Sequence, residues 1–270
     1  MNYDLHLNII SFFIFLLFLF ISFLNINRKF NLNKKLFLLS LLLTNISYSI
    51  ITVTLINQFN SNQISIFLFL SFSIILWIYM IFCLIDYSFI RLRLLFIPYF
   101  FIFIIILNFS IFSSQKFGYF NFYLFDNKLL SFHIVLSLLS YSFLTISAIS
   151  SIAVFAQERS LKSSFNRTNK LLDILPSMYE SEKITIKVLY VTQFFLLISL
   201  LTGYFYSKEV ADFYGFIYNE KSILSIITFF LICILLFVRF IFGITGKKVF
   251  NFVLLSYLFI NLAYFGYKIL

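Results

Sequence analysis

The sequence predicts an all-α integral membrane protein, a single polytopic domain over residues 1–270 with the N- and C-termini outside. Hydrophobic residues make up 62% of the chain and charged residues only 11%. The apolar residues are also collected in nearly uncharged runs, each about as long as a bilayer is thick. These runs predict a bundle of eight transmembrane helices, at about residues 8–24, 36–56, 64–84, 94–113, 130–156, 187–206, 222–242 and 249–267.

The first run follows the segment MNYDLHLN, which contains Asp4 and His6 but no lysine or arginine. A cleaved signal peptide would have a basic leader and a small-residue cleavage site. We therefore expect residues 8–24 to remain as a helix, with His6 in a tail ahead of it on the outer side. The basic segment NINRKFNLNKKL that follows is predicted to stay in the cytoplasm.

The next helices are separated by short polar segments. Residues 36–85 carry no charge and are too long for one crossing at a rise of ~1.5 Å per residue, so the polar patch at 57–63 is predicted to be an outer turn. A charged inner loop at 86–93 then precedes the fourth helix. Its Pro98 lies in the first turns, where a missing backbone N–H does least harm.

The fifth predicted helix contains His133, one of two histidines in the chain, about one turn inside its outer end. Seven residues share its helix face: Ser137, Ser140, Tyr141, Leu144, Ser147, Ala148 and Ser151. Most are small or polar, so this stripe is expected to face other helices rather than lipid. Ser142 and Ser150 fall off the stripe.

The longest loop, residues 158–187, is basic, and the stretch around Pro176 is amphipathic, which predicts an interfacial helix on the inner leaflet. On the outer side the lysines are few: Lys116, Lys128, Lys208, Lys221 and Lys268. The acidic residues divide evenly, so the net charge of +10 belongs to the inner face. This distribution is typical of a bacterial-type inner (plasma) membrane, and no nucleic-acid partner is needed to explain it.

Motifs for catalysis are missing from the sequence. It has no phosphate-cradling glycine loop, no paired catalytic carboxylates and no HExxH motif, and Cys83 and Cys233 lack metal-ligand spacing. We therefore expect no enzyme activity. The predicted helix interiors hold no acidic residue, which counts against an ion-coupled permease. Arg239 is expected to reach headgroup phosphates together with Lys247 and Lys248.

His133 has two interpretations. A histidine at a helix end commonly bonds a neighbouring carbonyl or water, and that role would be structural. Neutral imidazole is also a common ligand of haem iron, which makes His133 the candidate cofactor-binding and metal-binding residue. His6 is a weaker candidate for a second ligand.

Three stretches of the second half carry a family resemblance. They are FHIVLSLLSYSFLTISAISSIAVFAQERSLK, then LPSMYESEK with LLTGYFYS, and finally the stretch from NEKS through Arg239, Gly243 and Gly246 to AYFG. Over about residues 129–268 they resemble the cytochrome c assembly family, in particular its short HemX-like branch. The resemblance implies haem binding by His133, a role in cytochrome complex assembly, and maturation proteins as partners.

The sequence departs from that family at two places. Haem-exporting members have an outer loop rich in tryptophan, whereas Trp77 is the only tryptophan here and lies in the third predicted helix. Members usually carry a second outer histidine before the next-to-last helix, where this chain reads Tyr218-Asn219-Glu220-Lys221. Only His133 can then inherit a ligand role. The alternatives are a haem-free membrane scaffold or regulator of a partner transporter or enzyme, and a small-solute permease.

Overall fold

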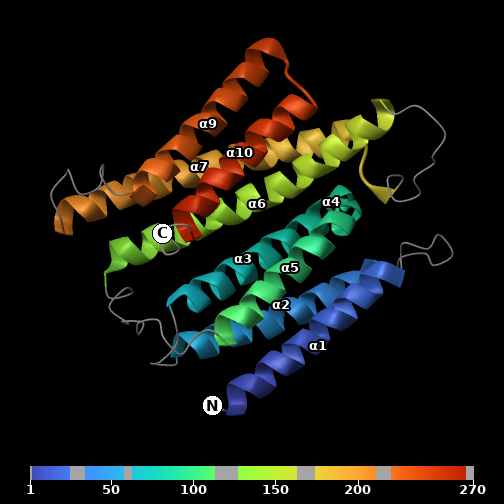
Figure 1. The fold of residues 1–270 in the computed structure, drawn as a ribbon, viewed down its shortest axis with the longest axis vertical. Helices are drawn as coiled ribbons and strands as arrows, with labels where there is room; N and C mark the ends of the chain where they lie inside the picture. Colours follow the sequence, from blue (N-terminus) through green and yellow to red (C-terminus); the bar gives the residue numbers. More distant parts are fainter. Residues whose placement is uncertain are drawn as a thin grey trace. The chain divides into compact units, whose positions relative to one another are not determined.

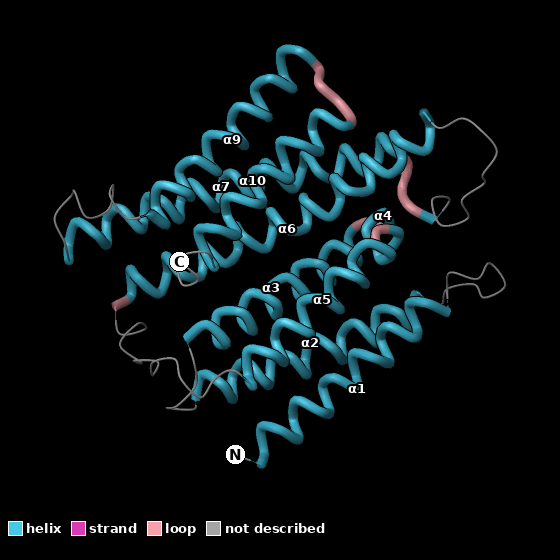
Figure 2. Tube along the Cα trace, viewed as in Figure 1, coloured by secondary structure: helices cyan, strands magenta, loops and turns pink. Residues whose placement is uncertain are grey.

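A computed structural model describes residues 2–24, 34–57, 63–112, 127–162, 174–210 and 220–265. Within these ranges the regular elements are helices and no strand occurs, as the tube in Figure 2 shows. The all-α prediction is therefore confirmed for the described part of the chain.

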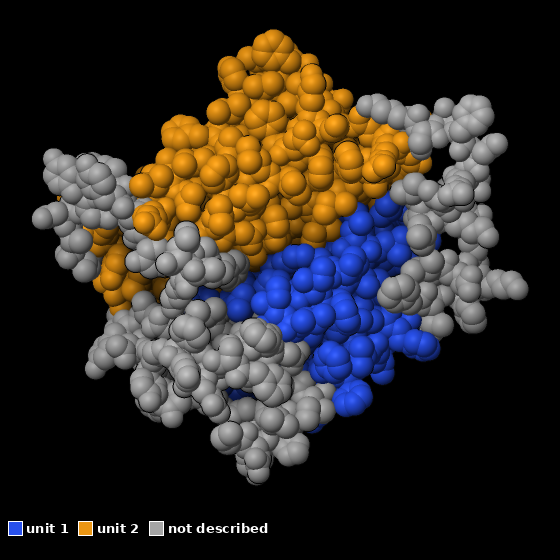
Figure 3. All heavy atoms as spheres, in the orientation of Figure 1, with its two compact units in different colours: residues 1–121, 169–175 blue, residues 122–168, 176–270 orange. Residues whose placement is uncertain are grey.

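The described helices fall into two compact units, coloured separately in Figure 3. Residues 1–121 and 169–175 form unit 1, and residues 122–168 and 176–270 form unit 2. Unit 1 contains α1 (Asn2–Leu24), α2 (Lys34–Asn57), α3 (Gln63–Ile85), α4 (Tyr87–Arg91) and α5 (Arg93–Phe112). Unit 2 contains α6 (Lys128–Lys162), α7 (Met178–Val210), α9 (Glu220–Phe242) and α10 (Lys247–Phe265), all labelled in Figure 1.

Five helices in the described ranges are long and apolar enough to cross a membrane. They are Lys34–Thr54, Phe67–Ile85, Lys128–Leu161, Met178–Lys208 and Glu220–Phe242. Two shorter apolar helices, Ile10–Ser22 and Arg93–Ile106, accompany them. The chain is thus a multi-pass membrane protein. Eight crossings, outer termini and a single domain over residues 1–270 stay predictions.

Unit 1 has a core of aromatic rings. Phe72 of α3 is fully buried, and its ring centroid lies 5.0 Å from those of Tyr48 and Phe103 and 5.7 Å from that of Phe100. The inner loop predicted after α3 is mostly the short helix α4, since the Asp86 carboxylate accepts from the Ser88 N–H at 2.9 Å and caps its first turn.

The start of α1 corrects the expectation for His6. Because α1 begins at Asn2, His6 lies inside the helix rather than in a tail ahead of it. Its side chain lies outside the described part of the structure, so its role as a second ligand stays a prediction.

Unit 2 is a four-helix arrangement in which α6 packs against α7 and α10, and α9 packs against the same two helices. The interfacial helix expected around Pro176 is not a separate element after that proline, because α7 begins at Met178. Ser177 and Glu180 form a capping box there: each backbone N–H donates to the other's side chain, at 3.0 and 3.3 Å. Residues 163–173 lie outside the described ranges.

The two longest helices extend beyond a bilayer. α6 has 35 residues and α7 has 33, which at ~1.5 Å per residue is about 50 Å, against ~30 Å of hydrocarbon. The predicted stripe on α6 is confirmed, since Ser140, Tyr141, Ser147 and Ser151 are buried. Burial is wider than predicted, because Ser150 also lies inside and contacts the Thr185 hydroxyl of α7 at 2.8 Å.

Candidate functional site

His133 is half-buried on the second turn of α6 and faces α7. Its Nδ1 lies 2.8 Å from the backbone oxygen of Ser199 and 3.4 Å from the hydroxyl of Thr202. A carbonyl oxygen can only accept, so Nδ1 carries the proton and donates it. In the neutral ring this leaves the lone pair on Nε2.

Local sequence explains why both partners are in place. Asn127 caps α6, with its side-chain oxygen accepting from the Leu129 N–H at 2.9 Å, and so sets where the helix begins. On α7 the Thr202 hydroxyl donates to the Ser199 oxygen at 2.9 Å. That carbonyl has two lone pairs and therefore accepts from both Thr202 and His133.

Further polar contacts hold α6 in position within unit 2. The Tyr141 hydroxyl donates to the side-chain oxygen of Asn261 on α10 at 3.2 Å. The Asn261 amide in turn donates to the Tyr257 oxygen at 2.7 Å. Together with the pair of Ser150 and Thr185, these contacts connect α6 to both of its neighbours and fix the helix that carries His133.

The donor chemistry of His133 fits an axial ligand of haem iron. A ligating histidine usually donates its second ring N–H to a carbonyl or carboxylate, which fixes the tautomer, and the Ser199 carbonyl does this here. Elsewhere in the described ranges, no group of three or more His, Cys, Asp and Glu residues could hold a metal ion. Glu220 is the first residue of α9, whereas Tyr218 and Asn219 lie outside the described residues.

A second polar cluster lies at the opposite end of unit 2, and sequence reasoning did not find it. Arg239 was expected to reach headgroups, but its guanidinium pairs with the Glu182 carboxylate and donates to the Ile244 oxygen at 3.2 Å. The other Glu182 oxygen accepts from the Gly246 N–H at 3.4 Å. Glu182 is only 5% exposed, so a buried carboxylate is matched by a cation and a backbone donor.

The turn between α9 and α10 completes this cluster. Gly243 and Gly246 both adopt positive φ, at 60° and 65°, a conformation that glycine takes without steric cost. The turn directs the first backbone N–H of α10, that of Lys247, onto the carboxylate of Glu158 on α6. The signal in the sequence is the pair of glycines three residues apart between two apolar runs, followed by two lysines.

The structure thus places the predicted site residue His133 in a defined polar contact through Nδ1. Where the resemblance would place a second histidine, Glu220 begins α9 and Asn219 lies outside the described residues. Serines of the stripe contact neighbouring helices, whereas Glu158, Glu182 and Arg239 form a separate cluster at the other end of α6 and α7.

Comparison with known proteins identifies the family. A protein of Azospirillum brasilense named "Uncharacterized 28.8 kDa protein in nifR3-like 5'region" is 35% identical over 138 residues, which cover 50% of this chain and 49% of that protein. The chain therefore spans about half the length of this curated relative. No solved structure matches the chain described here.

The family "Cytochrome C assembly protein" matches residues 36–270. This match begins well before the resemblance noted at about residue 129, and so includes most of unit 1 as well as unit 2. The match covers more than half of the sequence, and the chain therefore belongs to the cytochrome c assembly protein family.

Proposed function

We propose that this protein takes part in cytochrome c maturation by binding haem at the outer end of α6, with His133 as the iron ligand, and catalyses no reaction of its own. The family membership supports the maturation role. The observation that carries the haem site is the hydrogen bond from Nδ1 of His133 to the Ser199 oxygen, because it leaves a lone pair on Nε2.

The same hydrogen bond would tune the ligand. A carbonyl acceptor on Nδ1 holds the ring in one orientation and raises the basicity of Nε2, and loss of such a partner typically weakens metal affinity ~10–100-fold. Bound haem would supply an iron centre that accepts this lone pair. Because residues 218–222 offer no histidine, we propose one protein ligand from this chain.

The competing role is a haem-free membrane scaffold. A purely structural His133 would make the same contact with Ser199, so the hydrogen bond alone does not separate the two roles. They differ at Nε2: a scaffold needs nothing bound there, whereas a haem protein needs it for the iron. The deciding experiment must therefore report on Nε2.

Absorption spectra of the full chain in detergent, oxidised and reduced and with added haem, provide that test. We expect a Soret band that is lost or shifted in His133→Ala. The variant His6→Ala tests the weaker candidate, and with a single protein ligand it should leave the band unchanged. Imidazole added to His133→Gly should restore the band, since it replaces the missing ligand. No Soret band with added haem, or equal bands in wild type and His133→Ala, would overturn the haem site and favour the scaffold.

A further inference from the structure

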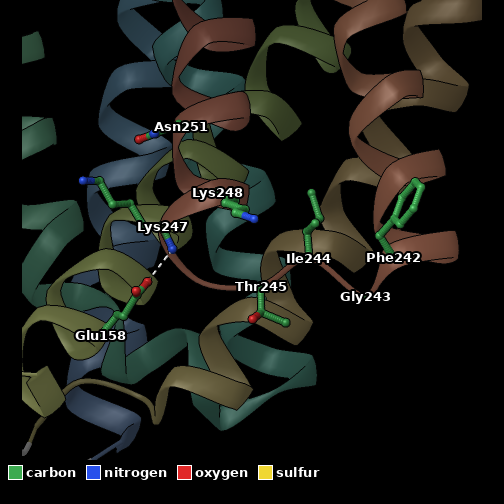
Figure 4. A pocket seen from close by; sticks show the side chains of 8 residues that line it. All are labelled: Glu158, Phe242, Gly243, Ile244, Thr245, Lys247, Lys248 and Asn251. Atoms are coloured by element: carbon green, nitrogen blue, oxygen red, sulfur yellow. Dashed lines mark hydrogen bonds between the residues drawn. The ribbon is translucent and has the colours of Figure 1, made fainter.

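A surface pocket lies at the turn between α9 and α10, away from the proposed haem site. It has a volume of about 470 Å³. Its lining residues, drawn in Figure 4, are Glu158, Phe242, Gly243, Ile244, Thr245, Lys247, Lys248 and Asn251. We propose that this pocket binds the headgroup of an anionic phospholipid. The proposal is independent of haem binding.

The pocket lies at the end of a helix that is long and apolar enough to cross a membrane. The membrane-spanning stretch Glu220–Phe242 stops at the residue where the pocket begins. The last residues of α9 are apolar and unusually open, with Phe240 86% and Phe242 73% exposed. A pocket at this depth is level with phospholipid headgroups, and the rings beside it offer a surface for acyl chains.

The acidic groups around the pocket already have hydrogen-bond partners. Glu158 accepts the N–H of Lys247, and Glu182 accepts that of Gly246 and pairs with Arg239. The backbone N–H groups of Gly246, directly before α10, and of Lys247, its first residue, are therefore occupied by carboxylates. Any attraction for a lipid phosphate must come from side chains.

Those side chains are Lys247 and Lys248, both exposed and, among the described residues, without an ion-pair partner. Figure 4 shows the side chains of Lys247 and Asn251 on one side of the first turns of α10, and that of Lys248 turned toward Ile244. Lys247 and Asn251 thus line the pocket from one side and Lys248 from the other, with the ring of Phe242 also in the lining. Basic pockets of this kind at membrane surfaces bind anionic headgroups, whereas a zwitterionic lipid offers no net charge.

Lipid binding to the full chain in detergent, measured by native mass spectrometry, tests the proposal. The probes are phosphatidylglycerol, phosphatidylcholine and inorganic phosphate. We expect tighter binding of phosphatidylglycerol than of phosphatidylcholine. Lys247→Gln combined with Lys248→Gln should weaken phosphatidylglycerol about 30-fold, as expected for two lysines at a membrane surface. These substitutions keep the backbone N–H of Lys247, so the contact with Glu158 remains.

The matched control is Lys183→Gln combined with Lys187→Gln, which removes two exposed lysines from α7 in the same unit. It should leave phosphatidylglycerol binding within about twofold of wild type. Asn251→Ala should weaken binding by a smaller factor than the lysine pair. Equal losses in the two double variants, no preference over phosphatidylcholine, or competition by millimolar inorganic phosphate would overturn a lipid headgroup site.

Discussion

The interiors of the two compact units, each taken by itself, differ in the balance of aromatic and polar contacts between helices. In unit 1, rings fill the interior: Phe72, Tyr79, Phe96 and Phe100 are all buried and lie close to one another. Polar contacts between its helices include those of Ser49 on α2 with Ser73 and Trp77 on α3. In unit 2, a larger set of polar groups joins neighbouring helices. Those pairs are His133 with Ser199, Tyr141 with Asn261, Ser150 with Thr185, Arg239 with Glu182, and Lys247 with Glu158.

This difference matters because lipid removes the hydrophobic driving force between helices. Aromatic packing then contributes volume and dispersion, and one apolar side chain of similar size can replace another. A directed polar contact instead requires particular partners at one register. Unit 2 has more such contacts between its described helices, and both proposed sites lie in it.

The largest expected effect is in unit 1. Phe72→Ala removes a fully buried ring that contacts three others, and we expect a loss of about 3 kcal/mol in the free energy of unfolding. Phe72→Leu keeps most of the volume and should lose less than half of that. Denaturation of the detergent-solubilised protein measures both. Equal losses in the two variants would contradict a core held by volume.

Next comes the buried ion pair of unit 2. Arg239→Met leaves the Glu182 carboxylate buried with only the Gly246 N–H, and we expect a loss of about 2 kcal/mol. This figure is below that of a fully buried pair because the Arg239 side chain is 27% exposed. The control Lys183→Met removes an exposed charge next to Glu182. We expect its loss in the free energy of unfolding to stay below about 0.5 kcal/mol, as for an ordinary surface substitution. If Lys183→Met lost as much stability as Arg239→Met, the loss could not be assigned to the ion pair of Arg239 and Glu182.

The two glycines of the α9–α10 turn offer a matched comparison. Each alanine substitution incurs ~1 kcal/mol for its left-handed backbone. At Gly243 nothing lies within 4 Å of the new Cβ, whereas at Gly246 the new Cβ would clash with a Glu158 carboxylate oxygen. Glu158 must then move away from the Lys247 N–H, so Gly246→Ala should be about 1 kcal/mol worse than Gly243→Ala. Thermal unfolding curves that coincide would show that Glu158 does not hold the turn.

Two tyrosines give the smallest effect. Tyr141→Phe removes the hydrogen bond to Asn261 in unit 2, and Tyr79→Phe removes that to the Phe89 oxygen in unit 1. Single interhelical hydrogen bonds in membranes contribute ~0.6 kcal/mol on average, so we expect losses of that size in both units. A much larger loss for Tyr141→Phe would show that the polar contacts of unit 2 stabilise it as a coupled network.

Several features were readable from residues alone. Uncharged apolar runs predict helices because a bilayer offers no other partner for backbone N–H and C=O groups. The serines of α6 predicted an inward face, and Ser140, Ser147 and Ser151 are buried. The start of α7 was missed although its signal, Ser177 followed by Glu180, is present in the sequence.

Contacts between distant residues could not be read in the same way. Arg239 and Glu182 are 57 positions apart, and the residues around either one do not indicate that the other is its partner. Charge and position favoured headgroups for Arg239, and the structure instead gives it a carboxylate. Likewise, the Ser199 carbonyl is a backbone group that any residue would supply, so only the packing of α7 on α6 selects it.

The sequence by itself determined that the chain is helical, lies in a membrane and carries one histidine near a helix end, because hydropathy and charge act locally along the chain. Tertiary structure decided which tautomer that histidine adopts and which acidic residues Arg239 and the α9–α10 turn contact. It also decided that Lys247 and Lys248 are exposed at the start of α10. Those outcomes depend on the distance between two atoms on different helices, which packing sets and no local pattern encodes.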